Sequence, residues 1–201
     1  EAALSTKQTT TEYKSALEDM IAQSDQLIRT FNAILMISRL EAGYSSERVE
    51  EVNLTAMAQD VAELYEPVAE DAGAKLNFSG SEQFNVQGNR ELLSQTLSNI
   101  LDNAIKYSVG SEKPEISVSV TSVANAPCIR VSDNGPGIAQ EDLERVTERF
   151  VRLEESRNAP GSGLGLSLAK AVMKLHKGEL RLESKGRGLN VELLFPAVIA
   201  P

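Results

Sequence analysis

The chain contains one amphipathic segment that is longer than a small domain can bury by itself. Between Thr11 and Glu41 there is no proline and no glycine, and apolar residues recur at the spacing of one helical face. A continuous helix of this length would extend about 45 Å at 1.5 Å per residue, and Gly43 is the residue expected to end it. The apolar stripe consists of Leu17, Met20, Ile21, Leu27, Ile28, Phe31, Ile34, Leu35, Ile37 and Leu40.

This stripe requires a partner. Residues 1–4 resemble the end of a preceding helix, and the polar residues 5–10 resemble the loop of a helical hairpin. Such a short neighbour cannot cover the whole stripe, so we expect a second copy of the chain to cover it in a helical bundle. The alternative is a helix that lies across its own domain.

Composition excludes several classes of protein. The 201 residues include 20 basic and 29 acidic side chains, a net charge of −9 that disfavours a nucleic-acid partner. A hydrophobic content of 41% and a charged content of 24% are typical of a globular protein. No apolar run approaches the roughly 20 residues of a membrane helix. With Cys128 and His176 each the sole residue of its type, we expect no internal disulfide and no histidine-rich metal centre. We predict a structural role for His176, and a small buried or half-buried side chain rather than a reactive thiol for Cys128.

After residue 43, helical and strand patterns mix, which predicts an α+β sandwich with helices on one face of a sheet in which strands adjacent in sequence largely pair with each other. We place the domain boundary between 1–46 and 47–201. Asn89 is the expected N-cap of the central helix. The predicted helices are 54–72, 89–107 and 165–175, and the predicted strands are 49–53, 75–78, 116–120, 128–132, 179–184 and 189–195.

The predicted central helix carries polar residues along one face. Asn99, Asn103, Lys106 and Tyr107 share this face by helical spacing. Amide oxygens can ligate Mg²⁺, and an ammonium group can neutralise phosphate. Taken alone, the pattern slightly favours an ordinary solvated helix face. The opposite face carries Leu93, Leu97, Ile100, Leu101, Ala104 and Ile105, which we expect to meet the sheet.

Two glycine-rich runs follow this helix. Residues 133–138, Asp-Asn-Gly-Pro-Gly-Ile, come directly after a predicted strand, so the Asp133 carboxylate stands at a strand end where it can accept a hydrogen bond from an exocyclic amine. Residues 161–166, Gly-Ser-Gly-Leu-Gly-Leu, open a helix, where free N–H groups favour a phosphate. One such run is a weak signal, whereas the ordered series of all three elements is a strong one.

The series resembles the ATP-binding domain of sensor histidine kinases, whose Bergerat fold is shared with gyrase, MutL and Hsp90-type ATPases. The segments 99–107, 133–137, Phe150 and 161–165 match the family's N, G1, F and G2 boxes. The resemblance covers roughly residues 49–196. The long helix that ends in Ile-Ser-Arg-Leu-Glu-Ala-Gly43 resembles the second helix of the family's dimerisation and phosphotransfer hairpin.

The resemblance implies a role for each matching residue. Asn103 would ligate Mg²⁺ with Asn99 nearby, and Lys106 would reach the phosphates of ATP. Asp133 would bind the adenine amino group. The remaining implied nucleotide-binding residues are Tyr107 against the nucleotide, Gly135 and Gly137 at the adenine, Gly161, Gly163, Leu164 and Gly165 at the phosphates, and Phe150 in the lid. The candidate lid cations are Arg149, Arg152 and Arg157, of which Arg152 fits the family pattern and joins Asn99 and Lys106 as a catalytic candidate.

The same resemblance separates kinase from ATPase. The related ATPases carry a glutamate, the base for water, where this chain has Asn99, and an amide cannot accept that proton. We therefore expect transfer of the γ-phosphoryl group to a histidine and then to an aspartate of a response-regulator receiver domain. The family's acceptor-histidine motif is absent, so we expect it upstream of residue 1, and we expect this chain alone not to autophosphorylate.

The resemblance further implies a homodimer through the N-terminal helix and a cytoplasmic location. In the family, attachment to the bacterial inner membrane would come only through segments absent from this chain. Two alternatives remain at this point. The chain could be a Bergerat-fold ATPase, or a non-catalytic pseudokinase scaffold with a vestigial pocket.

Overall fold

A five-stranded sheet with order β2-β4-β5-β7-β6 forms one layer of the α/β body. The computed structural model describes residues 10–41, 49–153, 162–184 and 186–197. Strands β2 and β4 pair in parallel, and the other neighbours pair antiparallel. The strands are β2 (Lys75–Ser79), β4 (Glu115–Val123), β5 (Ala126–Asp133), β6 (Glu179–Glu183) and β7 (Asn190–Leu194).

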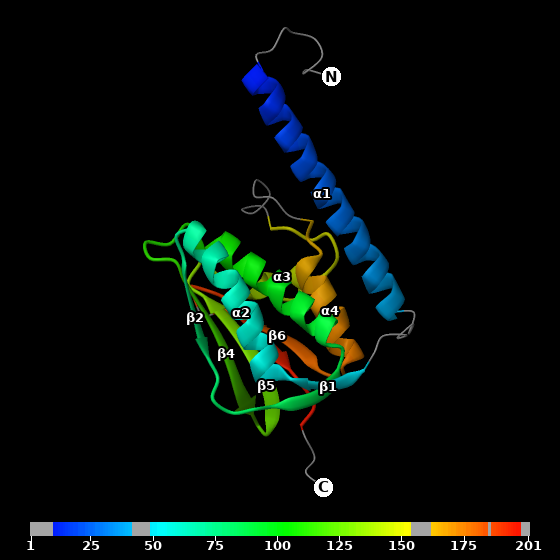
Figure 1. Cartoon of the computed structure of the whole chain (residues 1–201). Coiled ribbons are helices and arrows are strands. Elements are labelled where there is room, and N and C mark those ends of the chain that lie inside the picture. Colours follow the sequence, from blue (N-terminus) through cyan, green and yellow to red (C-terminus); the bar gives the residue numbers. More distant parts are fainter. Residues whose placement is uncertain (1–9, 42–48, 154–161, 185, 198–201) are drawn as a thin grey trace.

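Three helices cover one face of this sheet: α2 (Leu54–Asp71), α3 (Arg90–Ser108) and α4 (Gly165–Leu175) (Figure 1). Strand β4 shows why, because Ile116, Val118 and Val120 are buried whereas the alternating Ser117 and Thr121 are exposed. The period of two directs one set of side chains to the helices and the other to solvent. The predicted α+β sandwich with helices on one face is confirmed.

Local side chains determine where the helices begin. The Asn89 side chain accepts a hydrogen bond from the N–H of Leu92 at 2.9 Å, so the predicted N-cap of α3 is confirmed. Asn53 caps α2 in the same way through the N–H of Ala56, at 3.0 Å.

His176 joins the N-terminal end of α3 to the C-terminal end of α4. Its Nε2 accepts a hydrogen bond from the N–H of Asn89 at 2.9 Å, and its Nδ1 lies 2.8 Å from the carbonyl oxygen of Val172. These two contacts fit a tautomer in which Nδ1 donates to Val172 and Nε2 accepts from Asn89. Cys128 is fully buried, and burial raises the pKa of its thiol to about 11. Both residues have the structural roles that we predicted.

The structure contains one strand that the sequence patterns did not predict. Strand β3 (Asn85–Gly88) pairs antiparallel with β1 (Glu50–Asn53) in a separate two-stranded sheet. Its four residues include a single large apolar side chain, Val86, which is opposite Val52. A segment this short shows too little alternation to be recognised. Two short 3₁₀ helices, Gln140–Asp142 and Arg145–Thr147, occupy part of the stretch between β5 and α4.

Helix α1 (Thr10–Glu41) confirms the predicted long helix. Its C-terminal part lies against α4, whereas its N-terminal part projects beyond the α/β body (Figure 1). Ile37 is only 1% exposed and joins the core, with Ala33 and Met36 packed beside it. The predicted end of a preceding helix and its loop, at residues 1–9, lie outside the described residues.

Most of the apolar stripe of α1 remains accessible. The helix thus lies on its own domain at one end only, and the alternatives of intramolecular and intermolecular burial both stay open for the rest. None of the described helices combines the length and apolar character needed to span a membrane. The exposed apolar residues of α1 are Tyr13, Leu17, Met20, Ile21, Leu27, Ile28, Phe31, Ile34 and Leu35.

We predict that Ile37→Ala loosens α1 from the α/β body. The substitution removes a fully buried side chain and should lower the free energy of unfolding by about 2–4 kcal/mol. Urea unfolding and amide hydrogen exchange of α1 would measure the change. Leu64→Ala is the control, because Leu64 is 68% exposed on α2. Equal effects of the two substitutions would contradict the anchoring role of Ile37.

Candidate functional site

A cavity of about 490 Å³ opens between α3, the start of α4 and the loop that follows β5. Helix α1 contributes Asn32 and Ala33 to its lining. The end nearest the sheet is mostly apolar, with Val131, Leu189 and Val191. One elongated site thus has an apolar end and a polar end.

Helix α3 supplies the polar side of the cavity. Asn99, Asn103, Lys106 and Tyr107 all line it. The opposite face, from Leu93 to Ile105, is buried as predicted, and of that face only Ile100 and Ala104 also reach the cavity lining. The Nζ of Lys106 donates a hydrogen bond to the hydroxyl oxygen of Tyr107 at 3.0 Å and lies 4.6 Å from the centre of its ring.

Asp133 ends β5 and lines the cavity beside the apolar residues. Its Oδ1 accepts a hydrogen bond from the N–H of Gly135 at 2.8 Å, and the backbone of Leu189 also hydrogen-bonds to the carboxyl group. A carboxylate has about four acceptor positions, so it can accept a further hydrogen bond from a ligand. Burial raises the pKa of Asp133, while the Gly135 hydrogen bond acts in the opposite direction. An apolar slot with one carboxylate suits a flat ring that carries an amino group.

Asn134 holds the loop that follows Asp133 from the side of β4. Its side-chain oxygen accepts a hydrogen bond from the N–H of Glu115 at 2.9 Å, and its amide nitrogen donates to the carbonyl oxygen of Lys113 at 2.6 Å. The Ser111 hydroxyl donates to the carbonyl oxygen of Asn134 at 2.8 Å. These bonds satisfy the polar groups of a turn that would otherwise be mobile.

The glycine-rich start of α4 faces the amides of α3. Ser162, Gly163, Leu164 and Gly165 line the cavity, and Leu164, whose side chain has no acceptor, occupies the N-cap position. A Cβ on Gly165 would lie 3.4 Å from Nδ2 of Asn103, so the two walls are in close proximity here. Free N–H groups at a helix N-terminus favour an anion.

Comparison with known proteins identifies the family of the chain. Residues 88–199, more than half of the chain, match the family described as "Histidine kinase-, DNA gyrase B-, and HSP90-like ATPase". The chain belongs to this family. The match includes α3, the Asp133 loop and α4, the three elements that form the cavity.

Two relatives identify the branch of the family. The chain is 32% identical to the sensor protein IrlS of Burkholderia pseudomallei over 91% of its own length and 39% of that protein. It is 30% identical to the sensor histidine kinase CusS of Escherichia coli O6:H1, over 98% of its own length and 41% of that protein. The chain thus contains a histidine kinase ATPase domain of the sensor kinase type, and it spans about two fifths of the length of these relatives.

The fold agrees with this assignment. The chain superimposes on the crystal structure of full-length ShkA in complex with AMPPNP with a TM-score of 0.78 and 24% sequence identity. The match covers 95% of this chain and 40% of that one. The predicted Bergerat fold is confirmed.

The cavity contains most of the residues that the family resemblance singled out, but not all of them. Arg152 lines it, whereas Arg149 and Phe150 do not. Phe150 is 58% exposed, and its N–H donates to the carbonyl oxygen of Gly163 at 3.0 Å. Its φ of 63° is unusual for a residue with a large side chain. Gly161 and Arg157 lie outside the described residues.

Gly135 and Gly137 contribute differently from each other. Gly137 lines the cavity, whereas Gly135 is buried behind it and acts through its N–H on Asp133. A Cβ on Gly135 would lie 2.6 Å from the carbonyl oxygen of Tyr107, so glycine permits the loop to contact the end of α3.

Sequence reasoning missed several residues of the lining. Asp102 lines the cavity next to Asn103, and it accepts a hydrogen bond from the half-buried Tyr65 of α2. Burial, followed by the charge of Asp102, raises the pKa of Tyr65 to about 12. Asp102 directly precedes the predicted site residue Asn103, and this position could have indicated that Asp102 also lines the cavity. No local pattern could have indicated Asn32 and Ala33, because they reach the cavity only through the packing of α1.

We predict that Asp133→Asn stabilises the folded chain near neutral pH. The folded-state pKa of Asp133 lies above its ordinary value of 3.8, so folding disfavours its ionised form. This free-energy cost applies in full when the pH is above the folded-state pKa, and it disappears when the pH is below the unfolded-state pKa. The amide removes the cost and keeps an oxygen for the Gly135 N–H.

Urea unfolding of the unsubstituted chain and of Asp133→Asn should therefore show a higher free energy of unfolding for the variant at pH 7. This difference should shrink as the pH falls towards 4. Glu112→Gln, at an exposed loop position, should change stability little at either pH. A gain that is independent of pH would contradict the assignment to Asp133 ionisation.

Proposed function

We propose that the chain binds ATP in this cavity and transfers its γ-phosphoryl group to a histidine. The single observation that carries the proposal is the arrangement of the two ends of the cavity. Asp133 lies at the apolar end, where an adenine ring fits, and the amides of α3 face the N-terminus of α4 at the polar end. The complex of ShkA with AMPPNP supports an adenine nucleotide as the ligand.

The donor set suits a magnesium ion that arrives with the nucleotide. Among the described residues there is no group of three or more His, Cys, Asp or Glu side chains that could hold a metal. Asn103 offers an amide oxygen, with Asn99 beside it, and phosphate oxygens would complete the shell. When bound, Mg²⁺ would neutralise charge on the phosphates. Asn103 is the proposed ligand, and Asn99 would orient it.

The side chains at the polar end of the cavity favour transfer of the γ-phosphoryl group to a protein side chain over hydrolysis of ATP by water. We assign Lys106 and Arg152, which both line the cavity, to neutralising charge on the transferred group. The N–H groups of Gly163, Leu164 and Gly165 would donate to phosphate oxygens, with Gly161 as a further part of this loop. The Asn99 amide cannot take a proton from water, so a bound nucleotide would await a stronger nucleophile. Tyr107 would lie against the nucleotide, and Phe150 would belong to the lid.

The proposed acceptor is a histidine that this chain does not contain. His176 is unsuitable, because both of its ring nitrogens are engaged in hydrogen bonds at the ends of α3 and α4. We propose that the acceptor precedes residue 1, on the first helix of a hairpin whose second helix is α1. The phosphoryl group would then pass to an aspartate of a response-regulator receiver domain. The proposed location is the cytoplasm.

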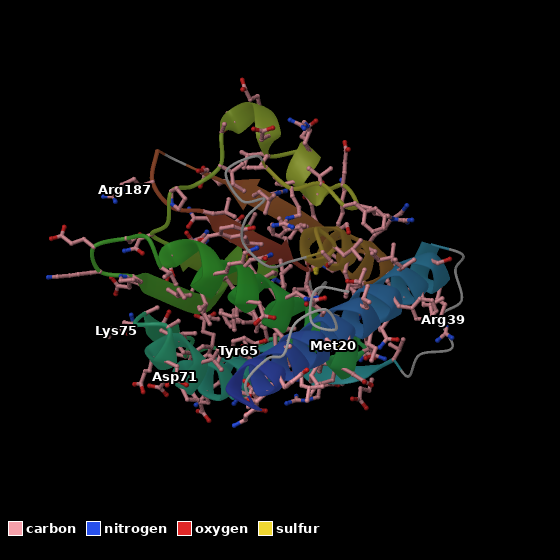
Figure 2. All side chains as sticks on the ribbon, turned by 90° about the horizontal axis from the view of Figure 1, so that it is seen from above. Met20, Arg39, Tyr65, Asp71, Lys75 and Arg187 are labelled. Atoms are coloured by element: carbon pink, nitrogen blue, oxygen red, sulfur yellow. The ribbon has the colours of Figure 1, made fainter. Side chains whose placement is uncertain are left out.

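The exposed stripe of α1 supports a homodimer. Leu27 is 71% exposed and Met20 63% exposed, whereas an isolated helix surface is normally polar. Met20 lies on α1 in Figure 2. A second copy would cover the stripe in a four-helix bundle formed with the proposed first helix. We propose residues 1–46 as the dimerisation segment and 47–201 as the catalytic domain.

We predict that Asn103→Ala lowers the affinity for a non-hydrolysable ATP analogue at least about tenfold in the presence of Mg²⁺, because one oxygen ligand of the metal ion is lost. Without Mg²⁺ the two proteins should differ little. Titration calorimetry measures both conditions. The control is Gln59→Ala on α2, whose exposed amide donates a hydrogen bond to Glu63 and does not line the cavity. Undiminished binding by the Asn103 variant would favour a vestigial pocket.

The reaction itself is tested with ATP labelled on its γ-phosphate. We expect the full-length protein to acquire an acid-labile, alkali-stable label, as phosphohistidine does, and to release phosphate only slowly. Replacement of the upstream histidine should abolish the label and leave nucleotide binding intact. Rapid Mg²⁺-dependent release of phosphate by the present chain alone would instead identify an ATPase and contradict the role given to Asn99.

A further inference from the structure

The outer side of the Asp133 loop contacts Ser184 and Gly188, two residues that do not line the cavity. Ser184 follows β6, and its hydroxyl oxygen accepts a hydrogen bond from the N–H of Ile138 at 3.0 Å. The same hydroxyl donates to the carbonyl oxygen of Gly188 at 2.9 Å. One side chain thus joins the end of the loop to the strand connection behind it.

Backbone bonds join the beginning of the loop to the same connection. The N–H of Asp133 donates to the carbonyl oxygen of Leu189 at 3.1 Å, and the N–H of Gly188 donates to the carbonyl oxygen of Gly135 at 2.8 Å. Ser184 adds a side-chain bridge at Ile138, which lines the cavity. The loop is therefore held at both ends.

This contact depends on two glycines in left-handed conformations. Gly137 has a φ of 77° and Gly188 a φ of 79°. A Cβ on Gly137 would lie 2.5 Å from the Ser184 hydroxyl and 2.9 Å from the carbonyl oxygen of Gly188, and a Cβ on Gly188 would collide with the backbone of Asp133. The close approach is specific, because no other residue type permits it.

Arg187 lies in the same connection between β6 and β7, but its side chain has a different orientation from that of Ser184. Its side chain is exposed and points away from the body of the molecule (Figure 2). The contact with the loop thus comes from Ser184 and Gly188, whereas Arg187 provides a nearby side chain that can be removed without altering it.

We propose that Ser184 is a positioning residue for the recognition of adenine. Its hydroxyl holds the segment from Gly137 to Ile138, the wall of the apolar end, at a fixed distance from Asp133. The carboxylate can select the exocyclic amino group only if the ring is held in one plane against that wall. The inference rests on the proposed function, because it assumes that adenine occupies this end of the cavity.

The experiment compares ligands that differ either in the number of phosphates or in the exocyclic amine of the base. Adenosine, ADP and ATP share the base and differ in phosphates, whereas inosine diphosphate lacks the exocyclic amine of ADP. Affinities are measured by titration calorimetry for the unsubstituted chain, Ser184→Ala, Ser184→Thr and Arg187→Ala, together with the melting temperature of each. Ser184→Thr keeps the hydroxyl and serves as the rescue variant.

We expect Ser184→Ala to weaken the binding of adenosine, ADP and ATP by the same factor, about 5- to 10-fold, as for the loss of one or two neutral hydrogen bonds. Its preference for ADP over inosine diphosphate should fall, because the binding of inosine diphosphate gains nothing from Asp133. Ser184→Thr should restore the preference, and Arg187→Ala should keep it.

Several results would overturn the proposal. An unchanged preference in Ser184→Ala, or an equal loss for ADP and inosine diphosphate, would show that Ser184 only supports the fold. If Ser184→Ala does not fold, the isosteric pair Ser184→Thr and Ser184→Val makes the same comparison, and equal preference in both contradicts the role of the hydroxyl. Failure of the unsubstituted chain to bind any adenine nucleotide would refute the proposed function, and this inference with it.

Discussion

The packing of α3 on the sheet determines the chemistry of the whole site. Its buried face, which includes Leu97, Ile100 and Leu101, can lie in only one orientation against β4 and β5. At 3.6 residues per turn, that orientation directs Asn99 and Asn103 away from the sheet. The polar end of the cavity is thus a consequence of hydrophobic burial on the other side of the same helix, and no separate interaction is needed to aim the amides.

The second wall is made largely of backbone. At the start of α4, and in the loop after Asp133, glycines bring N–H and carbonyl groups close to side chains of other elements. A wall of this kind offers hydrogen-bond donors without long side chains, so little conformational entropy is lost when an anion is bound. The chain can therefore carry a net charge of −9 and still present a site suited to phosphates, because the donors are dipoles and a few local cations.

Much of this arrangement follows from local sequence signals. The helical spacing of α3, the Asn89 cap and the alternation in β4 and β5 each depend on residues close together in the chain, so they could be predicted. The contacts that could not be predicted join distant segments. Strand β3 is defined mainly by its pairing with β1, Asn32 reaches the cavity only because Ile37 anchors α1, and the exposed position of Phe150 depends on a bond to Gly163.

The hydrogen bonds of His176 have a consequence for how the cavity can change shape. They join the residue before α3 to the C-terminal end of α4, the ends remote from Asn103 and Gly165. Because α3 and α4 are joined at one end, they can move apart only at the other end. The spacing between α3 and α4 is then fixed beside the imidazole ring, and any change in the width of the cavity comes at the opposite end, where Gly165 faces Asn103.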